Sequence, residues 1–186
     1  FHYVPMVLIG LSGLLLGRLA DTNGRKTVIM AGLAIYTLAC IAFAFGDTFL
    51  FYLGLLGVSG LAIGLFKTGA LALIGDISDD SLSHTRTMNK VEGFFALGAI
   101  AGPALVTLMI AASIHWKQLY LVAGLLCTVL VIMAARLPYP PYKASVTQIT
   151  LRQSLALLKD RYALGFSLAI ALYVACEVAI FVWLPT

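Results

Sequence analysis

Four charged side chains fall within nine residues of the stretch GRLADTNGRKT, which runs from Gly17 to Thr27 between two long apolar runs. The carboxylate of Asp21 and the cations of Arg25 and Lys26 can pair with one another, or with a charge or a helix end elsewhere in the chain. Such an interaction contributes about 0.3–1 kcal/mol when it is exposed. We therefore predict an electrostatic contact that can be broken and remade. The alternative is that these charges only solvate and orient a turn.

The same stretch does not fit a phosphate-binding loop, whose pattern is G-x-x-x-x-G-K-[ST] after a strand. Six residues separate Gly17 from Gly24, Arg25 precedes Lys26, and both flanking runs are long enough to be membrane helices. A nucleotide site is therefore excluded.

Two further charged residues, Lys67 and Glu177, interrupt long apolar runs. A charge at the centre of a bilayer costs about 2.5–3.5 kcal/mol even on the mildest scale, so such residues are candidates for function. Glu177 lies one helical turn from Tyr173, and an acceptor beside an aromatic ring suits a sugar or another polar solute. A carboxyl group in such a place can also carry a proton. Structural pairing of Glu177, and snorkelling of Lys67 towards water, are the alternatives.

The composition is that of a membrane protein. The chain is 61% hydrophobic and 11% charged, with a mean hydropathy of +1.01, whereas a globular domain is about 45–50% apolar and about 25% charged. A membrane helix needs about 20 apolar residues, and barrel strands would instead show alternation. The sequence therefore predicts an all-α membrane protein with six transmembrane helices. The predicted spans are 1–17, 27–46, 48–74, 93–114, 118–135 and 162–184.

The lysines and arginines in the connections between the predicted spans lie almost entirely on one side of the membrane. Lys117 is the exception on the other side. The positive-inside rule then places the Asp21 loop and the connection 138–160 in the cytoplasm, with the helices in the cell (inner) membrane. The net charge of +4 reflects this asymmetry and does not indicate nucleic acid. Basic residues on that side would attract anionic membrane lipids.

The two longer connections differ in composition. The segment 75–90 is predicted to be a polar loop, with Asn89 and Glu92 at the start of the next helix. The segment 138–160 opens with three prolines, which cannot continue a helix, and then has Thr150 and Gln153 at capping-box spacing. Its leucines recur at helical spacing, which predicts a short amphipathic helix on the membrane surface. The alternative is a covered loop with no regulatory role.

Small residues predict close helix packing in two spans. Gly60 and Gly64 share one face of the span 48–74 with Lys67, and this face should contact another helix or border a cavity. In the span 93–114, Gly98 and Gly102 allow a neighbouring backbone to approach, and Pro103 should bend the helix.

Cysteine and histidine do not form a recognisable site. The three cysteines lie in three different spans, which argues for packing residues rather than disulfides; they are Cys40, Cys127 and Cys176. The three histidines are scattered without metal-ligand spacing, and no catalytic triad is present. We therefore predict neither an enzyme nor a metal or cofactor.

The pattern G-x-L-A-D-x-x-G-R-K-x-x-[LIVM] that begins at Gly17 resembles the signature between the second and third helices of the major facilitator superfamily. One position departs from it, because Thr22 stands where a basic residue is common. The resemblance implies a twelve-helix carrier that works by alternating access, of which this chain is a fragment covering helices two to seven. It also implies three segments: 1–137 in the N-terminal bundle, 138–160 as the linker, and 161–186 as the first helix of the C-terminal bundle.

The resemblance further implies that the charged turn, which includes Lys26, acts as a latch on the gate. Gly17 would allow close helix contact and Gly24 a tight turn. Asp21 would face a helix N-terminus in the other bundle. Arg25 would pair with an acid at the inner end of the fourth helix, and Asp76 occupies that place.

Two apolar segments narrow the resemblance. EGFFALGAIAGPAL and YVACEVAIFVWLP resemble the fucose and glucose permease group, which implies proton-coupled transport of a small, sugar-like solute. Lys67 departs from this group, in which an acidic residue is expected near this position of the fourth helix. The glycines before Pro103 also resemble part of a drug-antiporter motif, so efflux of amphiphilic drugs is one alternative. A non-transporting membrane sensor or assembly subunit on the same fold is another.

Overall fold

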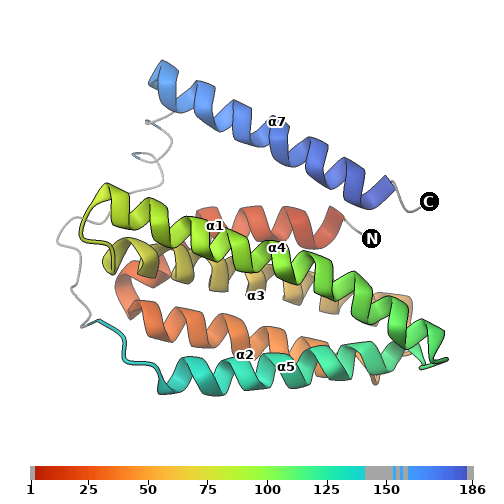
Figure 1. The fold of residues 1–186 in the computed structure, drawn as a ribbon. Coiled ribbons are helices and arrows are strands. Elements are labelled where there is room, and N and C mark those ends of the chain that lie inside the picture. The colour runs from red at the N-terminus through yellow and green to blue at the C-terminus, as the bar shows by residue number, and fades with distance from the viewer. Residues whose placement is uncertain (1–2, 141–152, 154–155, 157–158, 184–186) are drawn as a thin grey trace. The chain divides into compact units, whose positions relative to one another are not determined.

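The computed structural model describes residues 3–140, 153, 156 and 159–183, and every regular element among them is helical (Figure 1). The elements are α1 (Tyr3–Asn23), α2 (Arg25–Phe43), α3 (Phe49–Asp76), α4 (Ser81–Ala111), α5 (Trp116–Arg136) and α7 (Arg161–Trp183). The predicted all-α fold is confirmed.

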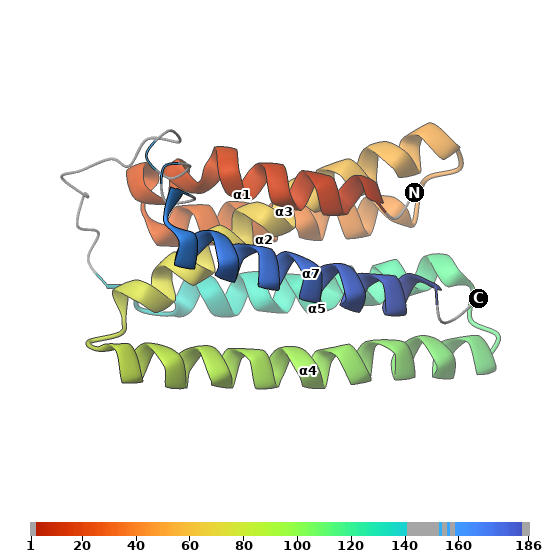
Figure 2. The same ribbon diagram turned by 90° about the horizontal axis from the view of Figure 1, so that it is seen from above.

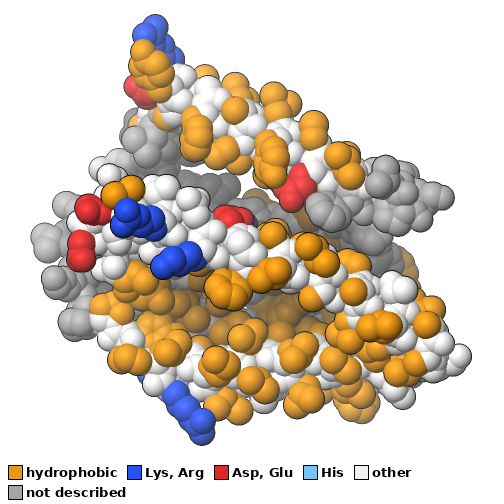
Figure 3. Space-filling model, in the orientation of Figure 1, with side chains coloured by type: hydrophobic (Ala, Val, Ile, Leu, Met, Phe, Trp, Pro, Cys, Tyr) orange, Lys and Arg blue, Asp and Glu red, His pale blue; other side chains and the backbone are white. Residues whose placement is uncertain are grey.

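Most of these helices are long and apolar enough to cross a membrane. By length and composition, α2, α3, α4, α5 and the part of α7 up to Ile180 qualify, and α1 contains the shorter apolar stretch Val4–Gly13. Figure 3 shows hydrophobic side chains over much of the visible surface of α4 and α5. This surface is expected where hydrocarbon rather than water is the solvent, so the chain is a multi-pass membrane protein.

The chain divides into two compact units, one with α1 to α5 and the other with α7. Within the first unit, α3 packs along both α1 and α2, and α2 packs along α5 on its other side (Figures 1 and 2). Helix α4 makes only a few contacts, with α3 and α5. The core of this unit is therefore the α1–α3–α2–α5 row.

Glycines set the closest of these contacts. A Cβ atom on Gly32 of α2 would lie 2.7 Å from the backbone nitrogen of Phe66 in α3. A Cβ atom on Gly60 of α3 would lie 2.6 Å from the carbonyl oxygen of Pro5 in α1. In a membrane, helices associate largely through van der Waals contact, and small residues let their backbones approach. These two glycines therefore allow α3 to lie against both neighbours.

Helix α4 begins earlier than the apolar pattern predicts. Its first residue is Ser81 rather than a residue near 93, and the carboxylate of Asp80 caps it by accepting a hydrogen bond of 2.6 Å from the Ser83 amide. The predicted loop 75–90 is therefore mostly helical, and Asn89 and Glu92 lie inside the helix rather than at its start. The physical reason is that hydropathy marks where a helix enters hydrocarbon, whereas the cap marks where it begins.

The segment after α5 agrees with the predicted effect of its prolines. Helix α5 ends at Arg136, and Leu137 is extended (φ −70°, ψ 139°) before Pro138, as the residue before a proline usually is. The amphipathic helix predicted around 150–158 lies almost entirely outside the described residues. The three-segment division of the chain stays a prediction.

Candidate functional site

The turn between α1 and α2 consists of the single residue Gly24. Helix α1 ends at Asn23 and α2 starts at Arg25, so the predicted turn 17–27 is much shorter than its charge pattern indicates. Gly24 is buried and has φ 84° and ψ 147°, a conformation that is unfavourable for residues with a Cβ atom. This turn brings Asp21 of α1 within reach of Arg25 of α2.

Arg25 holds the ends of three helices together. Its Nη1 donates to Oδ1 of Asp21 at 2.5 Å, and its Nε donates to Oδ2 of Asp76, at the end of α3, at 2.8 Å. The Arg25 side chain is 20% exposed, whereas the two carboxylates are 44% and 42% exposed. Each pair is therefore worth about 0.2–1 kcal/mol in a setting that water reaches. The Arg25–Asp76 pair implied by the resemblance is present, and its role as a latch stays a prediction.

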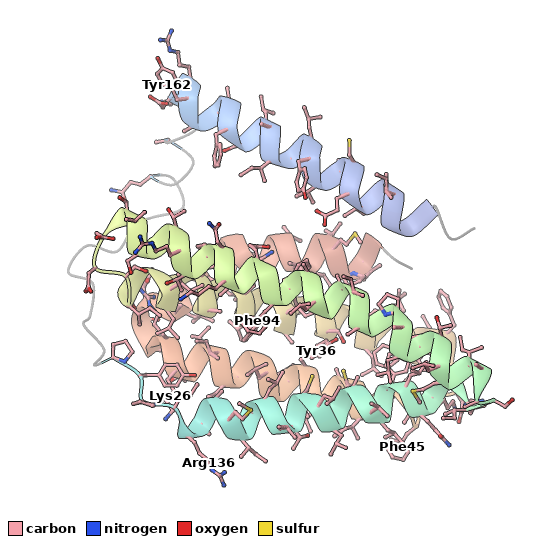
Figure 4. The ribbon with its side chains drawn as sticks, in the orientation of Figure 1. Lys26, Tyr36, Phe45, Phe94, Arg136 and Tyr162 are labelled. Carbon is pink, nitrogen blue, oxygen red and sulfur yellow. The ribbon has the colours of Figure 1, made fainter. Side chains whose placement is uncertain are left out.

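Lys26 points to a different partner. Its Nζ donates to the carbonyl oxygen of Ala135 at 3.0 Å and lies 5.4 Å from the centre of the Tyr139 ring. Figure 4 shows Lys26 beside the end of α5, with Arg136 projecting outward. The last carbonyls of a helix lack intrahelical donors and carry partial negative charge, so a cation is favourable there. Sequence reasoning grouped Lys26 with the latch and missed this contact, because its partner lies 109 residues away.

The glycine face of α3 contacts α1. A Cβ atom on Gly64 would overlap the hydroxyl of Ser12, which is itself almost fully buried. Lys67 lies one turn further along the same face and is exposed. Among the described residues, Lys67 forms no ion pair within 4.0 Å. Gly17 lies in α1, and its surroundings fall outside what the structure describes.

Glu177 and Tyr173 share one face of α7 because they are four residues apart. Glu177 is half-buried, whereas Tyr173 is 67% exposed. Helix α7 forms its own unit, so the two residues are described on that helix alone.

The glycines of α4 are not in close contact in the part of the chain described. No heavy atom lies within 4 Å of a Cβ atom placed on Gly98 or Gly102, so the helix neighbour that they are predicted to admit is not found there. Helix α4 continues through Pro103, whose carbonyl accepts a hydrogen bond of 2.9 Å from the Thr107 hydroxyl. The predicted bend at Pro103 stays a prediction.

An aromatic cluster lies at the end of the α1–α5 unit opposite the Gly24 turn, and it was not predicted from the sequence. Ring centroids of Phe43 and Tyr120 are 4.4 Å apart and stacked, and those of Tyr52 and Trp116 are 5.8 Å apart. These four residues, called the aromatic cluster below, join α2, α3 and α5. Their signal in the sequence was the recurrence of aromatic residues at the ends of three predicted spans.

Comparison with known proteins identifies the family. The profile described as Major Facilitator Superfamily matches residues 3–186. The Quinolone resistance protein NorA of Staphylococcus aureus (strain N315) is 29% identical over 133 residues, which cover 70% of this chain and 33% of NorA. The Niacin transporter NiaP of Acinetobacter baylyi is 30% identical over 138 residues, which cover 72% of this chain and 31% of NiaP.

The chain therefore spans about a third of the length of these curated relatives. The family profile nevertheless matches almost all of the chain itself. From this match, we conclude that the chain belongs to the Major Facilitator Superfamily.

Proposed function

We propose that the protein is a secondary transporter, not an enzyme, and that it moves a small organic solute across the membrane by alternating access. The observation that carries this proposal is that Arg25 joins α1, α2 and α3 through two ion pairs that are partly exposed to water. Contacts of this strength hold one conformation without making it permanent. Family membership supports the same conclusion.

In this proposal the Gly24 turn lies in the cytoplasm and acts as a latch on the inward-facing gate. Residues 1–137 belong to one helix bundle, 138–160 form the linker, and 161–186 begin the second bundle. Asp21 contributes through its pair with Arg25 and, as the resemblance implies, through a helix N-terminus of the second bundle.

The latch is tested by Asp21→Asn. This change removes a charge and keeps the shape of the side chain, so it should slow transport while leaving membrane insertion intact. Thr22→Ala, next to it on the same turn of α1, is the matched control. Transport by Asp21→Asn at the rate of the unchanged protein would contradict the latch.

We propose two classes of solute, each supported by a separate observation. A sugar-like solute, coupled to protons, is favoured by Glu177 beside Tyr173 on α7, since hydroxyl groups need an acceptor and a sugar ring packs on an aromatic face. Lys67, exposed on the glycine face of α3, is a separate candidate for substrate or proton coupling.

The second class is a nitrogen-containing aromatic compound, moved inward or outward. The printed names of the relatives refer to quinolone resistance and to niacin, and both terms denote compounds of this kind. The glycines before Pro103 in α4, which resemble part of a drug-antiporter motif, support the efflux form of this proposal.

One experiment separates these classes. The protein expressed from its complete gene would be placed in proteoliposomes under an imposed proton gradient, with labelled monosaccharides, niacin and a quinolone as solutes. Glu177→Gln is compared with Glu92→Gln, which changes an exposed acid within α4. Gradient-driven sugar accumulation that only Glu177→Gln abolishes would support the first class. Movement of niacin or quinolone without sugar would support the second, and no movement of any solute would favour the non-transporting alternative.

A further inference from the structure

The chain that leaves α5 lies against the first turns of α2. Leu137 is extended, and Pro138 and Pro140 restrict the backbone on both sides of Tyr139. Tyr139 is half-buried and packs against the core cluster of α2 and α5 that contains Ile29 and Ala134. The first residues of the connection 138–160 are therefore a stiff, extended segment attached to the bundle by one aromatic side chain.

Lys26 supplies the polar part of the same attachment. Its ammonium group donates to the Ala135 carbonyl at 3.0 Å, and the same group lies 5.4 Å from the centre of the Tyr139 ring. The first contact satisfies a carbonyl at the end of α5, and the second is a cation–π interaction. Among the described residues, no carboxylate lies within ion-pair distance of Lys26.

Two neighbouring residues of one helical turn thus hold different segments. Arg25 holds the ends of α1 and α3 through Asp21 and Asp76, whereas Lys26 holds the end of α5 and the start of the connection. Because both side chains leave the first turn of α2, a movement of that turn away from Asp76 also carries Lys26 with it. The extended Leu137–Pro140 segment has little freedom to absorb that movement.

We propose that Lys26 and Tyr139 form a junction that couples the Arg25 latch to the connection after α5. Lys26 is then a positioning residue, since it acts on the connection and does not touch the solute. The significance of this coupling rests on the proposed function, because it matters to a protein in which the latch opens. The junction is defined by the distances from Lys26 to Ala135 and to Tyr139, so it can be tested without measuring transport.

The test measures the distance between α2 and the start of the connection. Spin labels are attached at Leu38→Cys, an exposed position on α2, and at Leu137→Cys, the exposed first residue of the extended segment, so that both prolines are kept. The protein is expressed from its complete gene, carries serine in place of its native cysteines, and is reconstituted into lipid nanodiscs. Pulsed electron paramagnetic resonance then gives the distribution of distances between the labels.

Four variants are compared in this background. Lys26→Met keeps the length of the side chain and removes its charge, so we expect a broader distribution shifted to longer distances. Lys26→Arg can still donate to a carbonyl and stack on a ring, and should restore the narrow distribution. Lys90→Met removes an exposed cation of α4 and should change nothing. Asp76→Asn releases Arg25 and should shift the distribution although Lys26 is intact.

Each outcome decides one part of the proposal. The same distribution in Lys26→Met as in the unchanged protein would overturn the junction. A shift in Lys26→Met without a shift in Asp76→Asn would overturn the coupling to the latch. If all the expected shifts occur and no solute is transported, the junction stands and the proposed function fails.

Discussion

The two ends of the α1–α5 unit are held together in different ways. At one end, Arg25 and Lys26 join four helices through ion pairs and a single hydrogen bond to a carbonyl. At the other end, the aromatic cluster joins α2, α3 and α5 through rings whose centroids lie 4.4–6.1 Å apart. The Tyr52 hydroxyl also donates to the Gly46 carbonyl at this end.

This difference indicates which end can open. An exposed ion pair contributes about 0.2–1 kcal/mol, and its strength falls as salt screens the charges. An aromatic pair contributes about 0.5–1.5 kcal/mol beyond the area it buries, and salt has little effect on it. We therefore expect the aromatic end to stay joined while the charged end separates.

The largest effect is expected from Phe43→Ala. Phe43 is 5% exposed and stacks on both Tyr52 and Tyr120. The loss of these two ring contacts should cost about 1–3 kcal/mol of unfolding free energy, at about 0.5–1.5 kcal/mol each, in addition to the cost of the packing that is lost. Unfolding in a denaturing detergent, followed by circular dichroism, measures this cost. Phe45→Ala is the matched control, because Phe45 is 73% exposed (Figure 4). Equal costs for the two variants would mean that the cluster does not hold this end.

A smaller effect is expected from Arg25→Leu. It removes two partly exposed ion pairs, which amounts to about 0.4–2 kcal/mol. The loss should shrink at about 1 M salt because the Debye length is then about 3 Å. The same unfolding measurement at low and high salt tests this, with Arg136→Leu as the control for an exposed cation. A cost above that of Phe43→Ala, or one independent of salt, would contradict the comparison.

The smallest effect is expected from Asp47→Asn at the aromatic end. Asp47 lies 2.7 Å from Lys117 but is 82% exposed, so water screens the pair and the rings already hold the helices. We expect no measurable change in unfolding free energy. A loss as large as that of Arg25→Leu would show that charge, rather than the rings, holds both ends.

Much of the fold could be predicted from the sequence because the bilayer imposes a simple rule. A backbone in hydrocarbon must satisfy its own hydrogen bonds, so each long apolar run is a helix, and the helix cores lie where hydropathy places them. The start of α4 could not be found in this way, since its first turns are polar. The signal for it, Asp80 three residues before Ser83, is a capping pattern that hydropathy does not detect.

The candidate site was predictable in part. The resemblance implied that Arg25 pairs with Asp76, and that pair is present. The contact of Lys26 with Ala135 and Tyr139 was not predicted, although Lys26 is the next residue in the chain. Nothing in the local pattern distinguishes these two cations, because their partners depend on which helices lie beside α2.

The sequence by itself thus determined the helices, their membrane environment and the place of the charged turn, because these depend on local composition and on the solvent. The tertiary structure decided that α2 lies between α3 and α5, and therefore which charge each cation meets. Contacts between residues 51 and 109 positions apart depend on helix packing through small residues such as Gly32 and Gly60. That packing is a property of paired surfaces, which no single segment of sequence contains.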